Sequence, residues 1–253
     1  MTNLDFYYRT LDRIEEWLRY PQPSKDQEKI LGMYTDVIDY DFTAARLASE
    51  ESAKYYIAHM RTVPNFNIDY DLQHWIATQV DSKLLKKGLI LEFGVATGRT
   101  LNHFARLFPD KTVYGFDGFK GLPAHWTSYM RKGHFARNNL PRVRKNCELV
   151  VGWFDETLPK FVKRFSEPIA FLHIDCDMYF STVTVLNKLE NQIVPGTVIL
   201  FDEYINYPGW QDGEFRAWQE HVTQNKIQYE YIGRVSKHQK VALRVLSKYQ
   251  ACR

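Results

Sequence analysis

The sequence predicts an α/β protein with a mostly parallel, doubly wound sheet, an antiparallel hairpin at its carboxyl end and a helical extension at its amino end. Three observations predict this fold. Strand patterns alternate with helical patterns from Gly88 onward, the last two strand patterns are separated by a short polar stretch, and residues 1–86 contain no convincing strand. Alternation places helices on both faces of a parallel sheet, whereas a short connection permits only antiparallel pairing.

The extension, residues 1–86, places apolar residues at helical spacing in three segments. These segments are "FYYRTLDRIEEWLRY", "DQEKILGMYTDVID" and "DYDLQHWIATQVDSKLL", separated by "PQPS" and "VPNFNID". Because the ligand-binding edge of an open sheet needs a cover, we expect this extension to form a lid and an assembly element in a homodimer. The remaining residues, 87–253, should form the main domain.

The main domain should contain five alternating strands and a closing hairpin. The strand patterns are "LILEF", "TVYGFD", "ELVVGW", "IAFLHID" and "TVILFDE", and the hairpin strands are "IQYEYIG" and "QKVALRVL". Each of the first five is a short, apolar run of the kind that is buried on both faces of a sheet.

Composition excludes several classes of protein. A formal net charge of +3 is too small to indicate nucleic acid as the main partner. The three cysteines form neither a disulfide nor a zinc framework, and no run of about 18 apolar residues is present. We therefore expect a cytoplasmic protein without a membrane partner.

The segment "LEFGVATGRT" predicts a ligand-binding turn. Gly94 and Gly98 lie between a buried strand, residues 89–93, and a helix, residues 97–108. Free amide groups at such a helix start can accept a polar or anionic ligand. The spacing E-x-G-x-x-x-G disfavours a nicotinamide dinucleotide, which is bound by G-x-G-x-x-G. Close packing of the helix on the sheet remains an alternative reason for the glycines.

Acidic residues follow the second, fourth and fifth strands, at the edge where open α/β sheets bind ligands. Asp117, about two dozen residues beyond Gly94, could accept both hydroxyls of a ribose, or it could form a turn before Gly118.

The fourth strand ends with Asp175 and Asp177, and the fifth ends with Asp202 and Glu203. Four neighbouring carboxylates repel one another unless a cation or protons intervene, which favours Mg²⁺. Alternatively, Asp177 or Glu203 could cap a helix or face solvent. We expect His173 to be a packed core residue.

Five motifs, in order, resemble the macrocin and mycinamicin O-methyltransferase family: "LEFGVATGRT", "FDGFKGLP", "VGWFDETLP", "FLHIDCDMYFST" and "PGTVILFDEY", over residues 88–205. The resemblance implies a class I methyltransferase (Rossmann-like) fold with a seven-stranded sheet, and S-adenosylmethionine-dependent methylation of a sugar hydroxyl. It implies Mg²⁺ held by Asp175, Asp202 and Glu203. The cofactor-binding residues that it implies are Glu92, Gly94, Thr97, Gly98, Arg99, Thr100, Asp117 (ribose), Phe119, and Trp153 and Phe154 (adenine).

The mechanism expected from these parts is metal-assisted displacement at the methyl group. A metal ion lowers the pKa of a bound hydroxyl, and Asp175 or Asp177 could take its proton, with His134 as a further candidate. Related catechol-type enzymes have a lysine three residues after the first metal aspartate, where this chain has Met178.

Removing the charge of Asp202 should relieve repulsion among the neighbouring carboxylates and could stabilise the metal-free protein.

Two segments bear on the acceptor, which we expect to be a glycan or a nucleotide sugar. "MRKGHFARNNLPRVRKN" contains six Lys or Arg residues and is either a solvated loop or a site for an anionic acceptor. "YINYPGWQDGEFRAWQEH" offers aromatic rings that could pack against a sugar, although Trp218 should face the core.

Two other functions fit part of the pattern. A metal-dependent glycosyltransferase could use the Asp-x-Asp of "HIDCDMY", but that class requires neither the glycine turn with Asp117 nor the second acidic pair. A non-catalytic, cofactor-binding partner protein would not need the intact set of carboxylates.

Overall fold

The computed structural model describes residues 40–127 and 129–248. The chain divides into two compact units, residues 1–43 and 44–253, and only residues 40–43 of the first are described. The second unit contains the whole sheet. The two helices expected within residues 6–20 and 26–39 lie outside the described residues.

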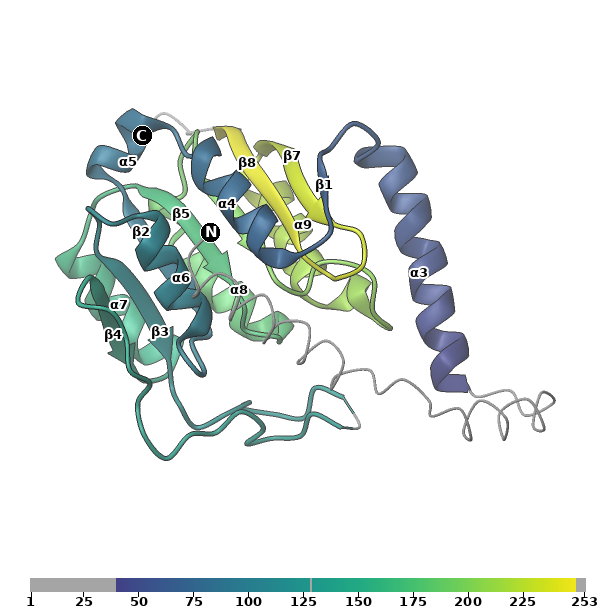
Figure 1. Cartoon of the computed structure of the whole chain (residues 1–253), viewed down its shortest axis with the longest axis horizontal. Coiled ribbons are helices and arrows are strands. Elements are labelled where there is room, and N and C mark those ends of the chain that lie inside the picture. The colour runs from purple at the N-terminus through teal and green to yellow at the C-terminus, as the bar shows by residue number, and fades with distance from the viewer. Residues whose placement is uncertain (1–39, 128, 249–253) are drawn as a thin grey trace, which may run out of the picture. The chain divides into compact units, whose positions relative to one another are not determined.

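The sheet has eight strands in the order β1-β7-β8-β6-β5-β2-β3-β4 (Figure 1). Every pairing is parallel except those of β8, which runs antiparallel to β6 and β7, so the expected parallel sheet and terminal hairpin are confirmed. The strands are β1 (Asn65–Phe66), β2 (Leu89–Phe93), β3 (Val113–Asp117), β4 (Cys147–Val151), β5 (Ile169–Ile174), β6 (Val198–Phe201), β7 (Ile227–Val235) and β8 (Val241–Lys248).

Strand β1 corrects the expectation that the extension contains no strand. Asn65 and Phe66 pair in parallel with Arg234 and Val235 of β7, at the edge of the sheet. Two residues are too few to show the two-residue alternation by which a strand is found in a sequence.

Helices cover both faces of the sheet. They are α3 (Tyr40–His59), α4 (Asp69–Gln79), α5 (Ser82–Lys87), α6 (Arg99–Leu107), α7 (Phe154–Arg164), α8 (Tyr179–Lys188) and α9 (Glu214–Asn225), with the short 3-10 helices η1 (Glu190–Gln192) and η2 (Trp210–Asp212). Helices α4, α5 and α6 share one buried cluster with the sheet, and α7, α8 and α9 share the other (Figure 1). The third helical segment expected in the extension is divided between α4 and α5, because Asp81 caps α5 by accepting the amides of Lys83 and Leu84.

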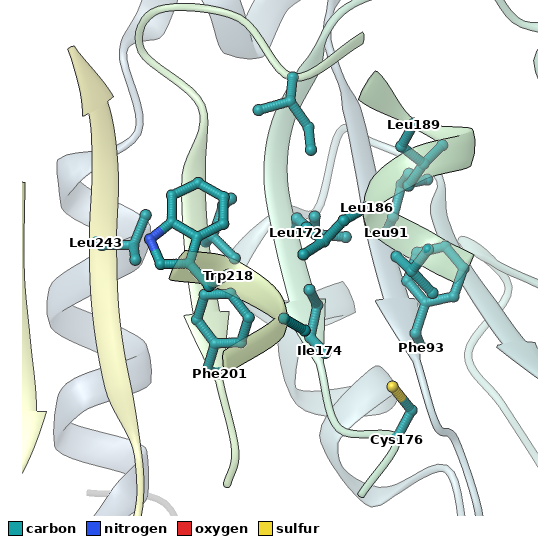
Figure 2. Close-up of a cluster of buried hydrophobic side chains, with 14 of the residues drawn as sticks. Leu91, Phe93, Leu172, Ile174, Cys176, Leu186, Leu189, Phe201, Trp218 and Leu243 are labelled. Carbon is teal, nitrogen blue, oxygen red and sulfur yellow. The ribbon is translucent and has the colours of Figure 1, made fainter. Parts of the chain in front are cut away.

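Successive side chains of β2 and β6 enter opposite clusters, as the alternation of a strand requires. In β2, Leu91 and Phe93 pack toward α7, α8 and α9, whereas Ile90 packs toward α4 and α6. Figure 2 shows the first of these clusters, in which Trp218 of α9 lies against Phe201 and Leu243. Trp218 is fully buried, which confirms its expected place in the core.

Helix α4 shares the core of the sheet. Leu72 and Ile76 are fully buried, and the indole of Trp75 donates to the carbonyl oxygen of Ile232 at 3.0 Å. Gly233 of β7 makes room for this helix, because a Cβ there would lie 2.6 Å from Cδ1 of Leu72. Whether the extension also covers the ligand-binding edge stays a prediction.

His221 of α9 should make folding sensitive to acid. Burial, aided by the charge of Lys248, lowers the pKa of this imidazole from 6.5 to about 4. As the pH falls, the imidazole of His221 therefore takes up its proton in the unfolded chain before it does so in the folded protein. The stability that neutral His221 contributes is complete above pH 6.5 and is lost as the pH falls toward 4. Between pH 7 and 4, the free energy of unfolding should fall by about 3 kcal/mol more for the wild type than for His221→Gln, measured by urea denaturation. If the free energy of unfolding fell equally with pH in the two proteins, His221 would not be the group that makes folding sensitive to acid.

Candidate active site at the carboxyl ends of the strands

The turn between β2 and α6 alternates left-handed residues with residues of ordinary conformation. The φ angles are 92° at Gly94, 42° at Ala96 and 76° at Gly98. Alternation of this kind directs successive backbone N–H groups toward one side, where they form a concave site for an anion.

Asp117, at the end of β3, fills this concave site. Its Oδ2 accepts the amides of Val95 at 2.9 Å and Ala96 at 2.8 Å, and its Oδ1 accepts the amide of Phe119 at 2.6 Å. The bond from Phe119 is the turn at Gly118 that the sequence offered as an alternative. The bonds from Val95 and Ala96, which hold the β2–α6 turn in place, were not anticipated. The expected contact of Asp117 with a ribose stays a prediction.

Gly94 brings the turn against the end of β5. The amide of Asp175 donates to the carbonyl oxygen of Phe93 at 2.8 Å, and a Cβ on Gly94 would lie 1.6 Å from the carbonyl oxygen of Asp175. Glycine is thus required at position 94, because the backbone of the turn lies against the backbone at the end of β5. This approach places the first acidic residue beside the turn.

The remaining residues expected to bind the cofactor surround the turn in different environments. Trp153 is half-buried and lies over Gly118, where a Cβ would be 3.3 Å from its ring. Phe154 packs edge-on against Phe93, with centroids 5.2 Å apart. Thr97 is exposed, Arg99 and Thr100 are half-buried in the first turn of α6, and Phe119 and Glu92 are buried.

Asp175 and Asp202 lie close together at the ends of β5 and β6. Their carboxylate oxygens and a ring nitrogen of His173 all lie within 4.8 Å of one another. Glu203 does not belong to this group. The structure therefore joins two of the three expected metal ligands and adds a histidine to them.

His173 is fully buried between two carboxylates. Its Nε2 lies 3.4 Å from Oδ1 of Asp202, and its Nδ1 lies 3.7 Å from Oε2 of Glu92, which is its direct neighbour in β2. Burial lowers the pKa of His173, but Asp202 and Glu92 outweigh it and raise the pKa to about 10. The two neighbouring carboxylates thus favour the charged form of His173, a residue of the core. Its buried position was expected, but its charge was not.

Lys240, at the start of the β8 region, is a site residue that sequence analysis missed. Its ammonium group binds Oδ1 of Asp202 and lies 3.5 Å from Oδ2 of Asp69, the first residue of α4. Burial would raise the pKa of Asp202, but Lys240 and His173 lower it well below its usual range. Burial likewise opposes the charge of Lys240, and Asp202 and Asp69 raise its pKa above the ordinary value.

Glu203 and Glu214 form a second acidic pair behind Asp202. Oε2 of Glu214 accepts the amide of Glu203 at 3.1 Å. Oε2 of Glu203 and Oε1 of Glu214 are buried without a hydrogen-bond partner among the described residues. Burial and the neighbouring acids raise the pKa of both side chains well above the usual range. The two side chains therefore favour protons or a cation.

Besides Asp175, the two other candidate general bases differ in position. Asp177 is half-buried with a left-handed φ of 59°, two residues beyond Asp175, and it contributes to the raised pKa of Glu203. His134 is exposed in the loop between β3 and β4.

The basic segment of that loop crosses the start of α6. Pro141 would lie 3.1 Å from a Cβ on Gly98, and Asn102 of α6 binds the backbone of Arg142 and Arg144. The six basic side chains themselves are exposed, at Arg131, Lys132, Arg137, Arg142, Arg144 and Lys145. The backbone is therefore anchored beside the cofactor turn, while the charges point to solvent.

The aromatic segment after β6 offers fewer rings than we expected. Tyr204 and Trp210 are buried and cannot present a ring face to a sugar. Tyr207 is half-buried and meets Trp126 of the β3–β4 loop, with ring centroids 6.1 Å apart. Within this segment, Tyr207, together with Trp126, stays available for contact with a sugar, because the other rings of the segment pack around α3 and α9.

Comparisons with known proteins agree with this geometry. The family described as "Methyltransferase domain" matches residues 91–204. Demethyldecarbamoylnovobiocin O-methyltransferase of Streptomyces niveus is 27% identical over 129 residues, which cover 43% of this chain and 48% of that protein. The chain thus spans about half the length of the curated relative that it matches.

Solved structures show the same fold. The calicheamicin methyltransferase CalS11 has a TM-score of 0.55 at 22% identity, covering 94% of this chain and 91% of its own. The O-methyltransferase NovP has a TM-score of 0.52 at 21% identity, covering 70% of this chain and 79% of its own. No helix within residues 40–127 and 129–248 is long and apolar enough to cross a membrane. The glycosyltransferase and partner-protein alternatives are not favoured, and the fold expected from the sequence is confirmed: the chain has the class I methyltransferase fold, and its residues 91–204 match the methyltransferase-domain family.

Proposed function

We propose that this protein is an S-adenosylmethionine-dependent O-methyltransferase that acts on a hydroxyl group of a sugar or a sugar-containing small molecule. The observation that carries the proposal is the fixed glycine turn, which meets the acidic cluster at Asp175. A cofactor bound at the turn would therefore lie beside groups that can hold and deprotonate a hydroxyl. The curated relative is named demethyldecarbamoylnovobiocin O-methyltransferase, which supports O-methylation of a small-molecule acceptor.

The cofactor supplies the methyl group as a sulfonium. The chain would bind its methionine part with Glu92, Gly94, Thr97, Gly98, Arg99 and Thr100, its ribose with Asp117 and Phe119, and its adenine with Trp153 and Phe154. The position of the Trp153 ring beside Gly118, the residue after β3, supports this role. Asp117 would hold the turn in one conformation while the cofactor binds, because it accepts the amides of Val95 and Ala96.

We also propose that Mg²⁺ binds Asp175, Asp202 and Glu203. Oε2 of Glu203 has no hydrogen-bond partner within residues 40–127 and 129–248, and Asp175 lies close to Asp202. Both observations fit a hard cation, which prefers carboxylate oxygens. When bound, the ion would supply positive charge that makes an acceptor hydroxyl more acidic. Asp177 would then take the proton, with Asp175, whose pKa burial and Asp202 raise, as the alternative acceptor.

The acceptor would enter between the basic loop and the segment after β6. Trp126 and Tyr207 meet there, and an anionic group of the acceptor, such as the diphosphate of a nucleotide sugar, would lie toward the exposed Arg and Lys residues of the loop. We further propose a homo-oligomer without nucleic-acid or membrane partners. A cytoplasmic location suits the free thiols of Cys147 and Cys176.

Asp117→Ala should weaken binding of S-adenosylhomocysteine by about 1 to 3 kcal/mol, because the turn loses the acceptor of two amides and the ribose loses a charged partner. Isothermal titration calorimetry measures this change. Asp110→Ala is the matched control, since Asp110 is exposed beyond α6. Unchanged affinity of Asp117→Ala would remove this residue from the site.

Thermal-shift titration separates the proposed enzyme from a glycosyltransferase. S-adenosylhomocysteine should raise the melting temperature, whereas uridine diphosphate with Mn²⁺ should not. The opposite result would sink the proposed function. Methyl transfer from labelled S-adenosylmethionine to nucleotide sugars, free polyols and catechols would then identify the acceptor.

A further inference from the structure

Lys240 places a positive charge in the cluster that we propose as the metal site. Its side chain is 10% exposed, and its ammonium group contacts Oδ1 of Asp202. A divalent ion on Asp202 would therefore meet an ammonium group already on the same carboxylate. In a partly buried site, two like charges a few ångströms apart repel strongly. The ammonium group of Lys240 and a divalent ion therefore cannot bind Asp202 at the same time in the present arrangement.

A second carboxylate can receive the displaced ammonium. Oδ2 of Asp69 lies 3.5 Å from Nζ of Lys240, and Oδ1 of Asp69 lies 2.7 Å from Nδ1 of His238. His238 thus orients Asp69 with one oxygen toward Lys240. Because a buried charge without a partner costs several kcal/mol, an ammonium that leaves Asp202 needs such a group. Rotation about the last bonds of the lysine side chain would be enough to move it there.

We propose that Lys240 competes with the divalent cation for Asp202, and that Asp69 holds the ammonium group while the metal is bound. Without metal, Lys240 neutralises Asp202 and keeps the acidic cluster folded. With metal, the ammonium moves to Asp69, so metal affinity depends on a residue of α4 that is distant in sequence. The inference rests on the proposed metal site and adds a residue that controls its occupancy.

The test compares metal affinity in three variants of the full-length protein. Mg²⁺ binding is measured by calorimetry, and Mn²⁺ binding by electron paramagnetic resonance, without acceptor or turnover. Lys240→Met should bind either ion about tenfold more tightly or better, which is the usual size of coupling between two sites. Asp69→Asn should bind about tenfold more weakly, because the displaced ammonium loses its second partner. Lys237→Gln, an exposed lysine of the same turn, should match the wild type.

The outcomes distinguish this inference from the proposed function. Equal affinity of wild type and Lys240→Met would overturn the competition and leave the metal site standing. Binding by Lys240→Met but not by the wild type would support the competition and remove Mg²⁺ from the wild-type reaction. No binding by any protein would overturn both metal statements, while S-adenosylhomocysteine binding would still test the methyltransferase. If Lys240→Met folds only in the presence of metal, the gain in melting temperature with Mg²⁺ replaces calorimetry as the readout and should exceed that of the wild type.

Discussion

Asp202→Asn should abolish nearly all methyl transfer, lowering kcat by about a thousandfold or more. This change keeps the shape of the side chain and removes the charge that would hold the cation and position the acceptor hydroxyl. Cofactor binding should change little, because the turn is held by Asp117 and not by Asp202. Methyl transfer from labelled cofactor and calorimetry with S-adenosylhomocysteine measure the two effects separately. Asp212→Asn, the same change at an exposed position, is the control.

The same variant should also be less stable, by about 3 to 5 kcal/mol in urea denaturation. This reverses the expectation from sequence that removing Asp202 relieves repulsion. Asp202 is held by Lys240 and by His173, so the asparagine leaves two buried cations without their shared partner. A variant as stable as the wild type would show that Lys240 and His173 do not depend on Asp202. Full methyl transfer by wild-type enzyme in excess chelator would contradict the metal proposal directly.

The central sheet could be predicted because its signals are local. Apolar runs such as residues 89–93 are buried on both faces, and their alternation with helices leaves few possible topologies. The edge carrying Asp117, Asp175 and Asp202 could be predicted for the same reason, since parallel strands end on one side. Strand β1 could not, because two residues carry no pattern and the sheet edge alone positions them.

The electrostatics of the site could not be predicted, because its cations and its extra acid come from distant elements. Lys240 enters from the β7–β8 turn, Asp69 from α4 and Glu214 from α9. Near Asp175, the sequence shows Met178 where a related class has lysine, and nothing local indicates that another lysine reaches Asp202 through the hairpin. Asp117 illustrates the same limit: its position follows from spacing, but its bonds to Val95 and Ala96 depend on how the turn folds.

Gly94→Ala should lower the free energy of unfolding by about 3 kcal/mol or more and reduce S-adenosylhomocysteine affinity by about a hundredfold. Two costs combine at this position. A φ of 92° strains any residue with a Cβ, and that Cβ would overlap the carbonyl oxygen of Asp175. The clash cannot be relieved by a side-chain rotation, because the opposing atom is backbone. Relief requires β2 and β5 to separate where the turn meets the acidic cluster.

Gly209→Ala isolates the first of these costs, the conformational strain of a positive φ. Gly209 has a similar φ of 81°, and a Cβ there would have no atom within 4 Å among the described residues, so this variant bears only the conformational strain, about 1 kcal/mol. The difference between the two variants in urea denaturation measures the close approach of Gly94 to Asp175. If both lost the same stability and both bound S-adenosylhomocysteine normally, the two backbones would not be in contact, and the turn would not link the cofactor to the acidic cluster. A large difference with weakened binding would instead show that one contact between backbones sets both the packing of the central strands and the place where methyl transfer occurs.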